Sequence, residues 1–141
     1  MSDCDHQNDV LIASIDKGKK VIKSITDFCR SNRIEGAWIS GIGALSEATL
    51  ALYDLDKKKY IKKTITEPLE ICVLNGNMAM TDSKHLAHIH IVVSNSKMQT
   101  FGGHLEEAVV AATCELKIEI FDHCLTRKFD PEIGLNLIQI G

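Results

Sequence analysis

Three histidines in the chain have a spacing that could place three imidazole rings around one metal ion. His88 and His90 lie two residues apart in an alternating stretch, and His104 follows Gly102 and Gly103. Residues two apart on a β-strand point to the same side, so the first two rings should project together. Three imidazoles can hold a divalent metal and leave one coordination position open. The spacing therefore predicts a metal site at His88, His90 and His104.

The residues around this set refine the expectation. The two glycines would let the backbone come close and let His104 turn toward the pair. Neutral imidazole suits zinc, which is the first expectation, although nickel, copper or iron would accept the same ligands. His85 has the opposite parity on the strand and is left out. The alternative is that each histidine is an ordinary polar side chain of a sheet.

An open position on a metal would permit catalysis if a general base lay beside it. A metal-bound water can have a pKa near ~7 and act as a nucleophile. Glu106 and Glu107 follow His104 closely, and Glu106 is the weak candidate for the base. Paired carboxylates also mark the first turn of many helices. The other interpretation is a structural or ligand-sensing metal whose fourth ligand is water, a carboxylate or a phosphate.

A second candidate site is the basic cluster in residues 55–65. Five lysines stand here against one acid, Asp56, which makes a local charge of +4. These are Lys57, Lys58, Lys59, Lys62 and Lys63. Such a cluster can attract a nucleic-acid backbone without reading bases. The simpler interpretation is a hairpin whose edge is protected by lysine, and the net charge of −3 does not favour polyanions.

The composition indicates one ordinary globular domain of 141 residues, of which 45% are hydrophobic. We expect a flexible segment over residues 1–8 and a single domain over 9–141. The five cysteines are odd in number and have no Cys-x-x-Cys spacing, which predicts reduced thiols, with Cys72 and Cys114 buried. The first residues are polar and acidic, unlike a signal peptide. No apolar run reaches the ~20 residues of a membrane span, so a cytoplasmic protein is expected.

Hydrophobic periodicity predicts one early helix followed by hairpin-linked strands. Asp16 is expected to cap a long helix beginning near Lys17, and Asn32 to end it. Residues 105–112 fit either a short helix or an extended continuation into the next strand. Strands are expected at residues 10–15, 37–40, 46–54, 60–66, 69–74, 85–93, 98–101, 113–121, 127–129 and 135–140. Residues 75–77 should form a turn or a bulge, with 78–80 continuing the strand. This order is typical of an α+β domain with a largely antiparallel sheet.

Five segments in this order resemble the plants-and-prokaryotes-conserved domain, called PPC or PCC, in its prokaryotic type. They are Ser40–Leu45, Leu52–Asp54, Leu69–Asn77, His88–His90 and Gly102–Leu105. The resemblance covers roughly residues 9 to 140. It implies an α+β fold whose antiparallel sheet packs in a homotrimer. It also implies a metal, with zinc expected, held by the three histidines already named.

The resemblance also raises DNA as a partner. Plant relatives carry the domain beside an AT-hook, an Arg-Gly-Arg-Pro element that enters the minor groove. This chain has no such element and only three arginines. Prokaryotic members are often labelled predicted DNA-binding proteins, a label that these residues do not explain. Three hypotheses follow: a metal-binding homotrimer that regulates through DNA, a partner protein or a small ligand; a zinc-dependent hydrolase or lyase acting on a small anionic substrate; and a structural trimeric scaffold.

Overall fold

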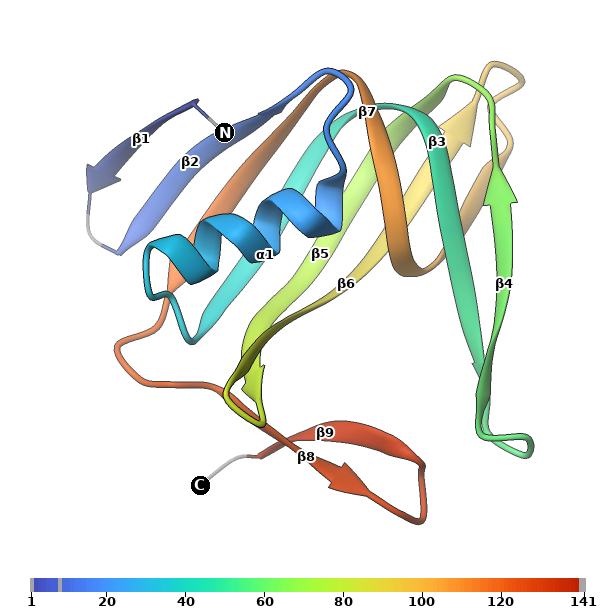
Figure 1. Cartoon of the computed structure of the whole chain (residues 1–141). Coiled ribbons are helices and arrows are strands. Elements are labelled where there is room, and N and C mark those ends of the chain that lie inside the picture. The colour runs from blue at the N-terminus through green and yellow to red at the C-terminus, as the bar shows by residue number, and fades with distance from the viewer. Residues whose placement is uncertain (1, 8, 140–141) are drawn as a thin grey trace.

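The protein is built mainly from β-strands that form one sheet. The computed structural model describes residues 2–7 and 9–139. The strands are β1 (Ser2–Gln7), β2 (Val10–Asp16), β3 (Ala37–Asp54), β4 (Lys59–Ile65), β5 (Leu69–Thr81), β6 (Lys84–Asn95), β7 (Thr100–Ile120), β8 (Thr126–Asp130) and β9 (Leu135–Gln139). Helix α1 (Val21–Ser31) lies across one face of this sheet (Figure 1). The largely antiparallel sheet expected from the sequence is confirmed, with a single parallel bridge between β5 and β8.

The long strands β3 and β7 curl the sheet upon itself. β3 pairs with β5 and with β7, while β6 pairs with β5 and with β7. These four antiparallel ladders form a closed ring, which is possible because β3 and β7 change partners along their length. Bulges interrupt both long ladders and increase the local bend. β4 pairs with the far part of β3, and the β8–β9 hairpin lies beyond the ends of β5 and β6 (Figure 1).

Strand alternation decides which side of β6 enters the core. Ile89, Ile91 and Val93 are buried with at most 2% of their surface exposed. They join one apolar cluster with Ile25 and Cys29 of α1. The even-numbered residues of β6 therefore face away from this core, as the sequence predicted for the histidines.

Helix α1 corrects one prediction, because it has 11 residues and begins at Val21 rather than near Lys17. The chain leaves β2 through a turn in which the Lys19 amide donates to the Asp16 carbonyl. Lys20 then forms a bridge with Val109 of β7 before the helix can start. The helix is therefore not long, although its expected end at Asn32 is confirmed.

Of the two alternatives for residues 105–112, the extended one is confirmed, because β7 continues through them as a strand. Two further expectations are wrong in detail. Residues 75–77 make no turn, because β5 runs through them in register with β6. Cys72 is exposed, whereas Cys114 is buried as expected. Cys72 has the strand parity of exposed Glu70, opposite to that of buried Leu69 and Ile71, so alternation along β5 places its thiol outside the core.

The structure does not test the flexibility expected of the N-terminal segment. Residues 1, 8, 140 and 141 lie outside the described part of the chain, so flexibility of residues 1–8 stays a prediction. Residues 2–7 pair with β2 as strand β1. Among residues 2–7 and 9–139, no helix is both long enough and apolar enough to cross a membrane.

Candidate metal centre

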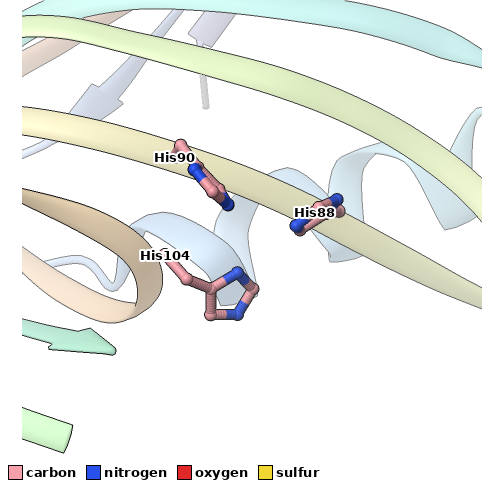
Figure 2. Close-up of side chains that lie close together, drawn as sticks. All are labelled: His88, His90 and His104. Atoms are coloured by element: carbon pink, nitrogen blue, oxygen red, sulfur yellow. The ribbon is translucent and has the colours of Figure 1, made fainter. Parts of the chain in front are cut away.

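The three histidines come together where β6 meets β7. His88 and His90 project from β6, and His104 is the ladder partner of His90 on β7. The ring centroid of His88 lies 5.1 Å from that of His90 and 5.2 Å from that of His104. The centroids of His90 and His104 are 5.8 Å apart. One nitrogen of each ring lies within 4.8 Å of the others. Figure 2 shows the rings turned toward a common space.

Two glycines allow this close approach of strands. A Cβ atom at Gly76 of β5 would overlap the carbonyl oxygen of His88 on β6. A Cβ at Gly103 would lie 2.9 Å from the carbonyl oxygen of Ala51 on β3. Since real Cβ atoms essentially never come this close to backbone, any other residue would push the strands apart. The glycines therefore set the position of His88 and His104.

The surroundings of the rings favour their neutral form. Burial is the main reason that the pKa of His88 is lowered to about 4, and the charge of Arg127 and the two neighbouring imidazoles contribute to the same shift. Burial also lowers the pKa of His104, helped by His90. The neutral ring is the form that binds a metal. Nδ1 of His104 is buried and has no hydrogen-bond partner among the described residues, as expected of a nitrogen available to a ligand.

Arg127 of β8 is a member of the site that the sequence analysis did not identify. Its Nη2 group donates to Nδ1 of His88 and to Oδ1 of Asn77, each at 3.0 Å. Its Nη1 group donates to the carbonyl of Asn136 at 2.9 Å. Because a guanidinium can only donate, Nδ1 of His88 holds its lone pair, and the neutral ring carries its proton on Nε2. A metal at Nε2 would require the other tautomer and would release Arg127 from the ring.

Two tyrosines attach neighbouring elements to the centre. The ring of Tyr60 on β4 stacks on His104 with centroids 5.0 Å apart. Tyr53 packs edge-on against Tyr60 and donates its hydroxyl to the Ile133 carbonyl at 2.9 Å. Ile133 belongs to the turn of the β8–β9 hairpin, so these contacts hold both β4 and that hairpin beside the imidazoles.

The two glutamates after His104 have different partners. Oε1 of Glu106 forms an exposed ion pair with Nζ of Lys62 at 2.6 Å. Glu107 accepts from the backbone amides of Ile22 at 2.8 Å and Lys23 at 3.3 Å. Glu107 on β7 therefore caps the first turn of α1. The residue at the N-cap position, Lys20, makes no capping hydrogen bond with its side chain. A pair of glutamates here was a possible mark of a helix start after His104, whereas Glu107 stabilises the start of α1.

The five lysines of the basic cluster do not share one face. On β4, Lys62 has the parity of Tyr60, whereas Lys59 and Lys63 point to the other side. The ammonium group of Lys63 lies 6.0 Å from the ring centroid of Phe101. Two others are engaged at the tip, where Lys57 pairs with Asp54 at 3.1 Å and Lys58 donates to the Pro131 carbonyl at 2.8 Å.

A curled antiparallel sheet with converging imidazoles between two of its strands defines a small β-rich domain with a candidate metal centre. The chain belongs to the Plants and Prokaryotes Conserved (PCC) domain family, whose model matches residues 3–122. The family resemblance stated from the sequence is thereby confirmed.

Solved structures extend this likeness to nearly the whole chain. A presumed DNA-binding protein of Bacteroides thetaiotaomicron superposes with a TM-score of 0.93 at 30% identity, over 97% of this chain and 96% of that one. A metal-containing protein of Archaeoglobus fulgidus has a TM-score of 0.86 at 35% identity, over 99% and 100%. A PPC protein of Pyrococcus horikoshii has the same TM-score at 26% identity, over 99% and 95%.

A curated relative places the same domain in a larger protein. The chain is 28% identical over 120 residues to the bifunctional protein GlmU of Synechococcus sp. (strain JA-3-3Ab). The match covers 83% of this chain and 18% of the relative. The chain therefore spans about a fifth of the length of that relative.

Proposed function

We propose that this protein binds one divalent transition-metal ion per chain through His88, His90 and His104. The observation that carries the proposal is the convergence of three ring nitrogens within 4.8 Å. The depressed pKa values of His88 and His104 add to it, because they keep these rings uncharged at neutral pH. The metal-containing relative of Archaeoglobus fulgidus gives independent support.

Zinc is the ion that fits this donor set first. Three neutral nitrogen ligands with a free position match a zinc site that takes a further ligand. Nickel, copper or iron would use the same ligands, so the metal is left to measurement. When bound, the ion would supply a positive centre that attracts an anionic or polar fourth ligand.

Metal content of the purified protein tests the proposal. After chelation and titration with zinc, the wild type should bind one ion per chain by elemental analysis. His90→Ala should weaken that affinity at least 100-fold, because only two ligands remain. His123→Ala is the matched control, since His123 is exposed and paired with Asp122. Equal zinc binding by wild type and His90→Ala would refute the site.

We also propose that the chain assembles as a homotrimer. The support is an apolar groove of about 390 Å³ on the side of the sheet that does not carry the core. Ile12, Ile42 and Val73 line it with 57%, 56% and 45% of their surface exposed. Exposed apolar surface of this kind marks interaction sites.

The mass in solution tests the assembly. Light scattering should give three times the chain mass of 15.6 kDa. Ile42→Asp places a charge in the groove and should yield monomers. Ile61→Asp on the edge strand β4 is the control, because Ile61 is 52% exposed and lies outside the groove. A wild-type monomer would overturn the homotrimer.

DNA binding is the activity for which two relatives are named, those of Bacteroides thetaiotaomicron and Ralstonia eutropha, and we propose it as a second candidate function. Three copies of the basic cluster would repeat around a trimer axis and could contact phosphates. The test is binding to a random duplex at ~0.15 M salt and its salt dependence. Changing Lys59 and Lys63 to Ala should weaken binding and flatten the salt slope. Failure of the wild type to bind removes DNA as a partner.

Catalysis has weaker support than binding. Glu106, the candidate base, is exposed and its carboxylate is paired with Lys62. This ion pair occupies one of the two oxygens that could accept a proton. We therefore propose a metal-dependent binding protein rather than a hydrolase or lyase, and a site that does more than support the fold.

A further inference from the structure

A cavity of about 290 Å³ opens beside the candidate metal centre. Its polar lining includes His88, His104, Arg127 and Tyr60. Its volume lies at the small end of the range for ligand pockets, so it suits a small molecule rather than a nucleotide or a polymer. The β8–β9 hairpin supplies one wall, which places Arg127 on the same side as the imidazoles.

The cavity has positive charge without a matching acid. All three hydrogen-bond partners of Arg127 are neutral, and its buried Nε atom has no partner among the described residues. Among the described residues, no acidic side chain forms an ion pair with Arg127. Glu106, the acid nearest in sequence to His104, is paired with Lys62. A partly buried cation normally lies beside an anion, so the missing partner points to an anionic ligand.

The other walls of the cavity are apolar. They come from β6 and β9 and consist of Leu86, Ala87, Leu135 and Leu137. Leu86 leaves 38% of its surface in water. An aliphatic group placed here would cover this surface, which is favourable at roughly fourfold in affinity per methylene. A fully hydrated anion such as phosphate gains nothing from these walls.

We infer that this cavity binds a small carboxylate with a short aliphatic tail. The Arg127 guanidinium holds the carboxylate, the leucines of β6 and β9 contact the tail, and the metal proposed at the histidines is the second positive neighbour. The inference rests on the proposed metal binding and deepens it. A planar guanidinium matches a carboxylate better than a point charge would.

Calorimetric titration of the zinc-loaded protein tests the ligand class. The probe is isovalerate, with its neutral amide, acetate and inorganic phosphate as comparisons. Isovalerate should bind at least tenfold more tightly than each of the other three. The amide tests the charge, acetate tests the tail, and phosphate tests whether any anion suffices.

Two variants locate the probe in the cavity. Arg127→Gln should weaken isovalerate at least tenfold while keeping one zinc per chain, and Arg127→Lys should fall between. Arg30→Gln is the control, because Arg30 pairs with Asp27 on exposed α1. Leu137→Ala should weaken isovalerate but leave acetate unchanged, which keeps the test valid if Arg127→Gln fails to fold.

The outcomes separate this inference from the metal proposal. A wild type that takes up no zinc overturns the proposed function and this inference with it. If the zinc-loaded protein does not bind isovalerate, or binds phosphate or the amide equally well, the inference about the cavity is overturned and the metal proposal still stands. Unchanged isovalerate affinity in both Arg127→Gln and Leu137→Ala also overturns it.

Discussion

His88, His104 and Arg127 border the same cavity, but the elements that hold the three histidines differ from the one that holds Arg127. His88 and His90 stand on β6, which pairs with β5 at both residues and with β7 from His90 onward. Arg127 stands on the β8–β9 hairpin, which joins the sheet by one bridge between Met80 and Thr126. Side-chain contacts such as that of Tyr53 supply the rest of its attachment. Backbone pairing thus holds the metal ligands in place, whereas a few side-chain contacts hold Arg127, the residue proposed to bind the carboxylate.

This difference indicates two levels of local stability. Segments with many ladder hydrogen bonds and buried side chains open only with the whole fold, whereas sparsely attached hairpins open locally. The family match, residues 3–122, covers the histidines and ends before the hairpin. We therefore expect a rigid metal site beside a wall that can move when a ligand enters.

The largest effect is expected from Gly76→Ala, which disturbs the rigid region. The added Cβ would overlap the carbonyl of His88, so β5 and β6 must separate at a cost of about 3 kcal/mol. Urea unfolding measures this loss, and zinc affinity should fall with it. A variant with wild-type stability and zinc binding would show that β6 is less tightly held than the ladder indicates.

The same comparison explains what could be predicted from sequence. Alternation in residues 85–93 placed His88 and His90 together, because strand parity is a local property. Arg127 has no such pattern around it. It joins the site only through contacts with residues 39 and 50 positions away, so its role follows from tertiary structure.

The start of α1 was mispredicted for a similar reason. Asp16 looked like a local cap, whereas the observed cap is Glu107, 85 residues from Ile22. The exposure of Val73 likewise depends on a register shift in β5 that simple alternation does not include. The strands and their order were largely predictable, and the residues that close the site from other elements were not.

The next effect concerns acid stability of the metal-free protein. The pKa of His88 is about 4 when folded and near 6.5 when unfolded. The unfolded chain therefore takes up protons first, and stability should fall as the pH drops from 6.5 toward 4. Chelated protein, unfolded in urea at pH 7 and pH 5, measures the fall. His88→Asn should show a shallower fall, and an identical slope would exclude His88 as its source.

A smaller loss should follow from Glu107→Ala, which acts on the rigid region without touching the histidines. The variant leaves the amides of Ile22 and Lys23 without their carboxylate. Loss of such a cap costs about 1 kcal/mol. Glu106→Ala is the control, since its exposed pair with Lys62 contributes little. Equal stability of the two variants in urea would argue against the cap.

The smallest global effect, and the sharpest test of the comparison, is expected from Tyr53→Phe. The change removes the hydroxyl that donates to the Ile133 carbonyl, one of the few contacts between the hairpin and the rest of the chain. The cost is about 1 kcal/mol, and it should fall on the hairpin alone. Hydrogen exchange should therefore quicken at β8 and β9 but not at β5 and β6, with zinc binding unchanged. Equal acceleration in both regions would mean that the hairpin opens only with the sheet, and that Arg127 is held as rigidly as the histidines.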